Sequence, residues 1–220
     1  MSGTGDHDPA GLLERARAAR VVAILRAPTA ERFVAASQVL YEAGCRAVEV
    51  TLTTAGAVEA LAAVRAALPA DAWVGAGTVL TPEEAEAVAD AGAQFVVSPV
   101  FDPEVLAVTL ARGVPLAPGA LTPTEIVRAH RAGVEVVKVS PIGSVGGVGY
   151  LQQVGAFLTG VPLMPTGGIS LDDVPAYLAA GAVAVGLGGP LVGDSLLPGG
   201  DLDGLRVRTA AVVRAAGVPA

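Results

Sequence analysis

Short runs of apolar, largely β-branched residues alternate along the chain with longer stretches in which apolar residues recur at helical spacing. Buried parallel strands typically have the first pattern, and amphipathic helices have the second. The alternation therefore predicts eight strands, at residues 21–25, 47–52, 73–79, 94–98, 114–117, 136–141, 162–166 and 182–187.

A helix is predicted after each strand, and a short additional helix is predicted at residues 10–20, before the first strand. Thr29 and Ser170 are expected N-caps, and a Thr-Pro pair opens the helices that begin near residues 81 and 122. We expect a glycine-rich turn at residues 143–149 and a last helix at residues 203–216.

Strands that alternate with helices indicate a parallel sheet covered by helices. Eight such units within 220 residues are typical of a closed (β/α)8 TIM barrel, which is an α/β fold. An open doubly wound sheet is the alternative, but it has fewer strands and no place for the eighth. No linker marks a second domain, so we expect a disordered tail at residues 1–9 and a barrel over residues 10–220.

Charge and hydropathy argue against several classes of function. The chain has a net charge of −7 and no basic run, so binding to nucleic acid or to an anionic membrane is not expected. No apolar stretch is long enough to span a membrane, and residues 1–9 lack the basic-then-apolar order of a secretion signal. A cytoplasmic protein is therefore predicted.

Residues that commonly ligate metals are scarce. The only cysteine, Cys45, is expected to be a small buried residue between a helix and a strand. His7 falls in the predicted tail and His130 on a predicted exposed helix face, so neither has a partner at metal-ligand spacing. We expect no metal and no cofactor, although an all-oxygen Mg²⁺ site stays open on this reasoning.

A single lysine stands in the sixth predicted strand. Lys138 is the only lysine of the chain, and valines flank it on both sides. A buried ammonium group is costly, and loss of its proton leaves an amine that can form a Schiff base with a ketone. The alternative is a lysine that extends to solvent or pairs with a carboxylate.

A glutamate is expected to face this lysine across the barrel. Alternation along a strand puts Lys138 and Ser140 on one face of the sixth strand. It likewise puts Glu49, Thr51 and Thr53 on one face of the second strand. The residues between them are apolar and must pack on helices, so the polar faces should point inward. An amine that attacks a ketone and a carboxylate that moves protons suit aldol chemistry, whereas an ion pair is the structural alternative.

Glycines cluster where the last two predicted strands end. In barrels of this kind, the loops at this place often bind a phosphate through backbone N–H groups. We therefore expect an anion site here, although tight turns alone would also explain the glycines. The residues concerned are Gly167, Gly168, Gly188 and Gly189.

Several ordered motifs over residues 21–192 resemble one family. They are Ala23-Ile24-Leu25-Arg26, Val48-Glu49-Val50-Thr51-Leu52, Gly75-Ala76-Gly77-Thr78-Val79-Leu80, Val97-Ser98-Pro99, Pro118-Gly119, Val137-Lys138 and Pro165-Thr166-Gly167-Gly168-Ile169. Together they are similar to the 2-keto-3-deoxy-6-phosphogluconate (KDPG) aldolases and 4-hydroxy-2-oxoglutarate (KHG) aldolases. This resemblance implies a class I aldolase on a (β/α)8 barrel, without a metal and usually a homotrimer.

The resemblance also implies roles for individual residues. Lys138 matches the Schiff-base lysine, and Glu49 matches the general acid and base. Thr78 matches a residue that helps to hold the pyruvate carboxylate, while Pro99 and Thr166 match other positions that line the pocket. The distal phosphate is expected at Gly167, Gly168, Gly188 and Gly189.

Three positions depart from the family pattern. Thr53 stands where phosphogluconate-specific members carry an arginine. We keep Thr53 as a candidate for binding the carboxylate, with Arg26 as the expected replacement for the arginine. Ser140 stands where an aromatic side chain is common, which leaves more room near the imine. Pro190 stands where a serine is expected in the phosphate loop, which removes a hydroxyl and an N–H group.

The sequence therefore predicts a lyase that splits a 2-keto-3-deoxy sugar acid, such as KDPG or KHG, into pyruvate and an aldehyde. One rival is a sugar-phosphate isomerase or epimerase on the same barrel, which has no use for an imine. The other is a non-catalytic sugar-acid binding protein, which would bind pyruvate without forming an imine.

Overall fold

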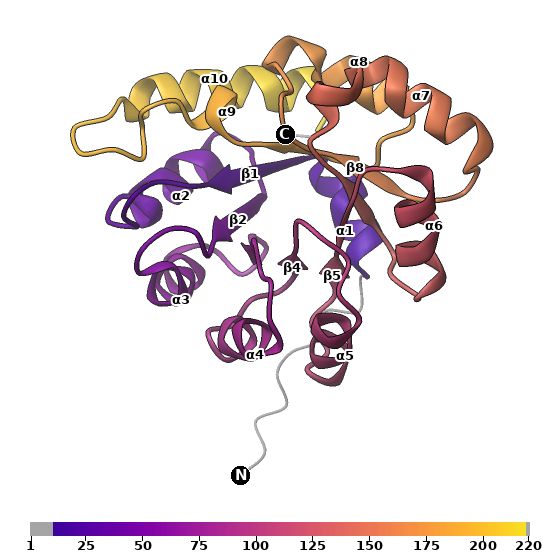
Figure 1. Cartoon of the computed structure of the whole chain (residues 1–220). Coiled ribbons are helices and arrows are strands. Elements are labelled where there is room, and N and C mark those ends of the chain that lie inside the picture. The colour runs from indigo at the N-terminus through magenta and orange to yellow at the C-terminus, as the bar shows by residue number, and fades with distance from the viewer. Residues whose placement is uncertain (1–10, 219–220) are drawn as a thin grey trace.

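The computed structural model describes residues 11–218. The predicted tail at residues 1–9, which includes His7, lies outside the described residues. The described chain is an α/β structure of parallel strands connected by helices, as predicted (Figure 1). Its strands are β1 (Val21–Leu25), β2 (Ala47–Thr51), β3 (Trp73–Gly77), β4 (Val96–Val97), β5 (Leu116–Ala117), β6 (Gly119–Ala120), β7 (Val137–Val139), β8 (Leu163–Pro165) and β9 (Val185–Leu187).

The helices follow the predicted order, and most begin or end within a few residues of the predicted positions. The α-helices are α1 (Leu12–Ala19), α2 (Phe33–Glu42), α3 (Ala57–Ala67), α4 (Pro82–Asp90), α5 (Pro103–Ala111), α6 (Pro123–Arg131), α7 (Gly147–Phe157), α8 (Val174–Ala179), α9 (Gly189–Val192) and α10 (Leu202–Ala215). Two 3₁₀-helices, η1 (Ile142–Val145) and η2 (Leu171–Asp173), precede α7 and α8.

Two of the expected local features are wrong. Thr29 does not cap α2, because it forms an isolated parallel bridge with Ala55 and the helix begins only after Arg32. The glycine-rich turn is shorter than predicted, since η1 occupies its first half and α7 begins at Gly147. Ser170 does cap the next segment, because its hydroxyl accepts a hydrogen bond from the backbone N–H of Asp173 at 3.3 Å.

The strands form a six-stranded sheet in the order β5-β4-β3-β2-β1-β9 and a three-stranded sheet in the order β6-β7-β8. All of the pairings are parallel. The first strand pairs directly with the last one, which the strand order of a doubly wound sheet does not allow. An isolated bridge between Thr166 and Gly186 connects the two sheets, and only Pro118 separates β5 from β6.

Two apolar clusters fill the structure. One lies between the strands and the surrounding helices, and it includes Val48 and Val50 of β2. The other collects residues from both sheets, and three residues of α1 join it at the end where the strands begin (Figure 1). Its members are Leu12, Ala16, Ala19, Val22, Ala47, Trp73, Phe95, Val97, Ala117, Val136, Met164 and Ala184.

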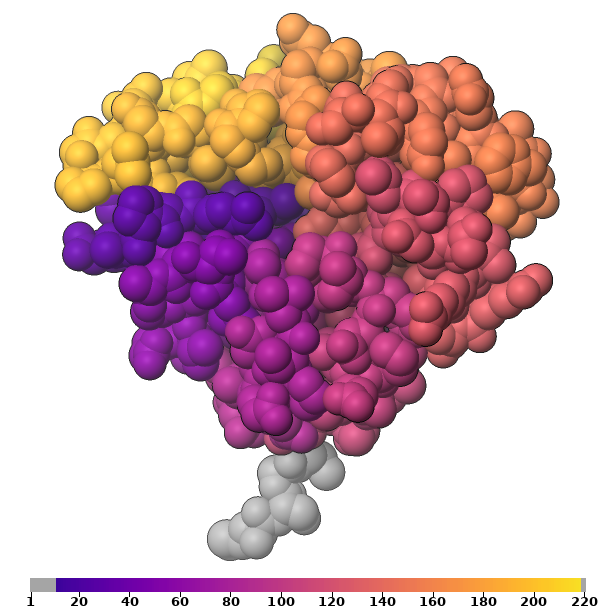
Figure 2. Space-filling view, viewed as in Figure 1, coloured from indigo at the N-terminus to yellow at the C-terminus, as the bar shows by residue number. Residues whose placement is uncertain are grey.

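The C-terminal part of the chain lies against the N-terminal part, as the adjoining yellow and indigo segments in Figure 2 show. Helix α10 contacts α2, and a hydrogen bond of 2.7 Å from Arg206 to Glu42 connects them. Within residues 11–218, no helix combines the length and apolar character that a membrane span requires.

Candidate active site

A cavity of about 500 Å³ opens beside the carboxyl ends of β1, β2, β7, β8 and β9. Most of the residues predicted to form the site line this cavity. They are Arg26, Glu49, Lys138, Thr166, Gly167, Gly168, Gly188 and Gly189, together with Ser140 and Pro190. The structure therefore brings together residues that are distant in the sequence.

Glu49 and Lys138 enter the cavity from two strands that are not neighbours in either sheet. The side chains of the two residues are buried, with exposed fractions of 1% and 6%. Val48 and Val50, the neighbours of Glu49, pack in the helix-facing cluster. The prediction that the polar face of this strand points inward is therefore correct for Glu49 and Thr51, but not for Thr53, because alternation ends with the strand at Thr51.

The carboxyl group of Glu49 is held in an unusual environment. Its Oε1 atom is buried and has no hydrogen-bond partner among the described residues. Burial raises the pKa of Glu49, whereas the positive charges of Lys138 and then Arg26 act to lower it. A buried polar atom without a partner is costly, and at a functional site it commonly marks the place of a ligand or water.

Thr78 and Thr53 were both predicted to bind a carboxylate, but only Thr78 contacts a residue that lines the cavity. Thr78 accepts a hydrogen bond of 3.2 Å from the guanidinium group of Arg26, which lines the cavity. Its backbone has a φ of 62°, a left-handed conformation that is strained for a β-branched residue and common at functional sites. Thr53 is exposed, donates a hydrogen bond to Thr51 at 3.3 Å and does not line the cavity.

The strand ends near the glycines provide potential hydrogen-bond donors. The Thr166 hydroxyl is buried and has no partner among the described residues, and it lies in the space that a Cβ atom on Gly186 would need. Gly167 and Gly168 have φ values of 87° and 72°, and their backbone N–H groups donate no hydrogen bond within residues 11–218. These N–H groups can therefore serve a ligand.

Pro99 does not line the same cavity as Lys138. It borders a second cavity of about 260 Å³, and Ser140 lines both. Pro99 packs closely on Gly119, because a Cβ atom at Gly119 would lie 2.1 Å from the Pro99 carbonyl oxygen.

The other residues discussed from the sequence lie away from this site. Cys45 is buried between α2 and β2 as predicted, and burial raises the pKa of its thiol to about 11. His130 is half-buried in α6 rather than on an exposed face, because the helix turns its Nδ1 atom inward. Among the described residues, no group of three or more His, Cys, Asp and Glu side chains could hold a metal ion.

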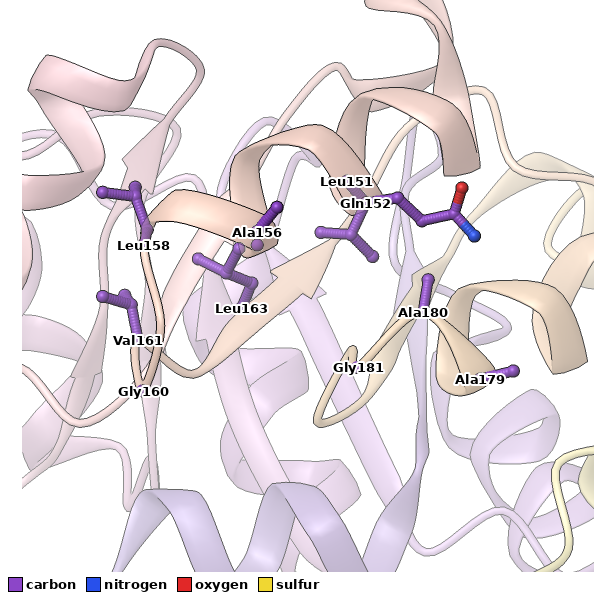
Figure 3. A pocket seen from close by; sticks show the side chains of 11 residues that line it. Leu151, Gln152, Ala156, Leu158, Gly160, Val161, Leu163, Ala179, Ala180 and Gly181 are labelled. Carbon is purple, nitrogen blue, oxygen red and sulfur yellow. The ribbon is translucent and has the colours of Figure 1, made fainter.

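A different cavity, of about 430 Å³, lies between α7 and α8 (Figure 3). Aliphatic side chains such as Leu151, Leu163 and Val161 line it, and none of its lining residues is titratable. It therefore has no group that could move a proton or attack a substrate, and the cavity with Lys138 is the candidate active site.

Some residues that shape the site were not anticipated from the sequence. Ile24 lines the cavity, and alternation along β1 would have put it on the inward face with Val22. Arg32 donates hydrogen bonds to the carbonyl oxygens of Ser195 and Gly200, at 2.9 and 3.0 Å, and so fixes the loop after α9. No sequence pattern could have identified this contact, since it joins residues more than 160 positions apart.

Comparisons with known proteins agree with this arrangement. The family model for KDPG and KHG aldolases matches residues 12–207. A 2-dehydro-3-deoxy-phosphogluconate aldolase of Treponema pallidum is 44% identical over 167 residues, which cover 76% of this chain and 78% of that protein. The KHG/KDPG aldolase of Escherichia coli is 37% identical over 183 residues, which cover 83% of this chain and 85% of that protein.

A solved structure is also similar over almost its whole length. The KDPG aldolase of Legionella pneumophila, with pyruvate captured as a covalent carbinolamine intermediate, superposes with a TM-score of 0.83 at 28% identity. The match covers 91% of this chain and 97% of that chain. From the family model and the two sequence relatives, together with this structural match, it follows that the chain belongs to the KDPG and KHG aldolase family.

Proposed function

We propose that this protein is a class I aldolase that cleaves a 2-keto-3-deoxy sugar acid into pyruvate and an aldehyde through a Schiff base on Lys138. The observation that carries the proposal is that a buried lysine and a buried carboxyl group with an unpartnered oxygen line the same cavity. The Legionella relative, which holds pyruvate as a carbinolamine, supports it, because a carbinolamine is the adduct that precedes an imine.

The reaction begins when the Lys138 amine attacks the C2 carbonyl carbon of the keto acid. Loss of water gives an iminium ion, whose positive nitrogen accepts the electron pair of the C3–C4 bond as that bond breaks. The C4 hydroxyl loses its proton, and C4 leaves as the aldehyde carbon. The remaining enamine takes up a proton at C3, and hydrolysis releases pyruvate and the free lysine.

Glu49 is the proposed carrier of these protons. Its carboxyl group lies in the lysine cavity, and burial makes it retain a proton to a higher pH than an exposed glutamate, because burial raises its pKa. The unpartnered Oε1 atom leaves a hydrogen-bonding position for the substrate or a water molecule. A positioned carboxyl group of this kind can both donate and accept a proton during one turnover.

Arg26 is the proposed partner of the substrate carboxylate. Arg26 lines the cavity, and its guanidinium group donates a hydrogen bond to the hydroxyl oxygen of Thr78. An arginine can bind a carboxylate through two parallel hydrogen bonds, which also fixes its orientation. Thr53, which occupies the position of the arginine of phosphogluconate-specific relatives, is outside the cavity and supplies no replacement.

The distal end of the substrate is proposed to lie at the glycine loops. The free N–H groups of Gly167 and Gly168 suit a phosphate or a carboxylate, and Gly188 and Gly189 line the same cavity. Pro190 offers neither an N–H nor a hydroxyl group here, so anion binding rests on the glycines. KDPG and KHG, the substrates named for the relatives, differ in this distal group.

Two alternative functions receive less support. An epimerase that acts on N-acetylmannosamine 6-phosphate shares the fold with a TM-score of 0.68, but only at 12% identity. An isomerase has no chemical need for a buried lysine, and a binding protein has no need for an unpartnered glutamate beside it.

We also infer how the two sheets close and how many copies of the chain assemble. The bridge between Thr166 and Gly186, and the continuity of β5 with β6 across Pro118, support a closed eight-stranded barrel made from the two sheets. The resemblance supports a homotrimer. Light scattering would test for three copies of the 21.7 kDa chain.

The proposed function is tested by supplying KDPG and KHG separately and measuring pyruvate with lactate dehydrogenase. We expect turnover of at least one of them by the native protein and none by the Lys138→Met variant. Full activity of that variant would exclude the Schiff base on Lys138. Inactivity of the native protein toward both acids would redirect the search to other 2-keto-3-deoxy acids.

A further inference from the structure

Ser140 stands between two cavities at the carboxyl ends of the strands. It lines the cavity that contains Lys138 and also the second cavity of about 260 Å³. Pro99, Leu121 and Arg128 are among the residues that bound this second cavity. Ser140 follows Lys138 by two residues, and Gly119, which also lines the second cavity, pairs with Lys138 in the sheet. The second cavity therefore adjoins the strand end that carries the lysine.

The charges around the second cavity do not favour an anion. Glu125 and Arg128 both line it and carry opposite charges. Hydrogen bonds from the backbone N–H groups of Thr122 and Leu121, at 2.7 and 2.9 Å, lower the pKa of Glu125. Its carboxylate is therefore charged at neutral pH and opposes an anion that approaches Arg128.

The other walls of the second cavity carry apolar side chains. An apolar group is stabilised where these side chains shield it from water. These walls come from Pro99, Val100, Phe101, Ala120 and Leu121.

Under the function proposed above, the other parts of the substrate already have their places. Arg26 lies where it can hold the carboxylate, and the loops at Gly167 and Gly188 lie where they can hold the aldehyde end. This assignment leaves C3 of the keto acid, which carries only hydrogens in pyruvate, for the side of the cavity that Ser140 lines. The small Ser140 side chain leaves space on this side for a substituent.

We propose, on the basis of that function, that the second cavity admits an alkyl substituent on C3, so that the enzyme uses 2-oxobutanoate and other 3-substituted 2-oxo acids as well as pyruvate. The Lys138 amine condenses with the C2 carbonyl and releases one water. Loss of one C3 proton gives the enamine, and C3 then forms a bond to the carbonyl carbon of an aldehyde. The aldehyde oxygen takes up a proton, and hydrolysis returns the lysine and a 3-alkyl-4-hydroxy-2-oxo acid, with no oxidant or reductant.

The test follows exchange of C3 protons for deuterium by NMR in D2O, with pyruvate and 2-oxobutanoate as separate probes and no aldehyde present. We expect the native protein to catalyse exchange in both acids. The Ser140→Val variant narrows the opening and should lower the rate with 2-oxobutanoate, relative to pyruvate, by about tenfold or more. The Ser140→Ala variant keeps the space and should keep the ratio.

The outcomes distinguish this inference from the function on which it rests. Exchange with pyruvate alone would overturn the inference and leave the aldolase proposal intact. An unchanged ratio in Ser140→Val would also overturn it, because the second cavity would then not be the place of the substituent. Exchange with neither acid would contradict the Schiff base itself. The Lys138→Met variant supplies the background rate.

Discussion

A Cβ atom on Gly77 would lie 1.9 Å from Oε1 of Glu49, so the carboxyl group of Glu49 occupies the space that a larger residue at position 77 would need. Gly77 ends β3, directly beside β2, and it pairs with Thr51. The absence of a side chain at Gly77 therefore makes room for the buried carboxyl group of Glu49.

Replacement of Gly77 by alanine should displace the Glu49 side chain without removing it. A misplacement of about 1 Å in a catalytic group can lower the rate on the order of 100-fold. We expect a loss of this size in kcat, with retention of the borohydride-trapped pyruvate adduct, because Lys138 is unchanged. Steady-state kinetics and intact mass measure the two quantities.

The matched control for that experiment is Gly155→Ala. Gly155 lies inside α7, and nothing comes within 4 Å of an added Cβ atom. Alanine is favoured over glycine within a helix, so the control should be as stable as the native protein or more stable, and fully active. Equal activity of both variants would contradict the role assigned to Gly77.

The buried carboxyl group of Glu49 should reduce stability at neutral and alkaline pH. Burial raises the pKa of Glu49 above its ordinary value of 4.5, against the opposing charges of Lys138 and Arg26. Between 4.5 and the raised pKa, the folded protein binds more protons than the unfolded chain, so stability falls as pH rises through this window. Glu49→Gln removes the ionisation and should raise the melting temperature at pH values above the window.

This prediction is checked by thermal unfolding of both proteins over a range of pH. The excess in melting temperature of Glu49→Gln over the native protein should shrink toward the acidic end. The aldolase activity of this variant should be lower than that of the native protein at every pH, by about 100-fold or more. The exposed Glu42, which pairs with Arg206, gives a control, since Glu42→Gln should change stability by less than about 1 kcal/mol. A melting temperature of Glu49→Gln below that of the native protein at high pH would contradict the account.

Arg26 should act mainly on substrate binding. We expect Arg26→Gln to raise KM for the keto acid about tenfold or more, since a hydrogen-bonded charge pair is lost. The reaction steps at Lys138 should change less. Arg206→Gln is a matched arginine control on the surface of α10 and should leave KM unchanged. Equal KM values for the native protein and Arg26→Gln would mean that a different group binds the substrate carboxylate.

The thiol of Cys45 should be inert in the folded protein. Burial raises its pKa from 9.0 to about 11, so the thiolate fraction at a given pH is lower by about 100-fold. We expect no reaction with a disulfide reagent at pH 8 until urea unfolds the chain. Rapid modification of the native protein would contradict the buried position of this residue.

The strands could be predicted from the sequence because their information is local. Alternation identified the inward face of β2, where Glu49 and Thr51 are buried, and of β7, where Lys138 is buried. The start of α2 could not be predicted from the potential cap Thr29. This residue instead forms a parallel bridge with Ala55, which is distant in the sequence. The Thr-Pro pairs did mark the starts of α4 and α6, and the structure shows Thr81 and Thr122 as caps whose partner glutamates lie three residues away.

The site was predictable in its residue types but not in its contacts. A lone lysine in one apolar strand and a glutamate on the inward face of another indicated the site from the sequence. The close approach of Glu49 to Gly77 could not be predicted in this way, because it depends on strand register. The separation of Pro99 from the lysine cavity also depends on packing, here on its contact with Gly119. Such distances arise only when the strands are assembled.

The most direct test of the central claim is the intact mass of the protein after incubation with pyruvate and sodium borohydride. With a Schiff base on Lys138, we expect the mass to increase by one reduced pyruvate adduct per chain, mapped by peptide analysis to Lys138, and no increase in Lys138→Met. A folded native protein that gains no mass, or an adduct on the terminal amine alone, would contradict the Schiff-base mechanism.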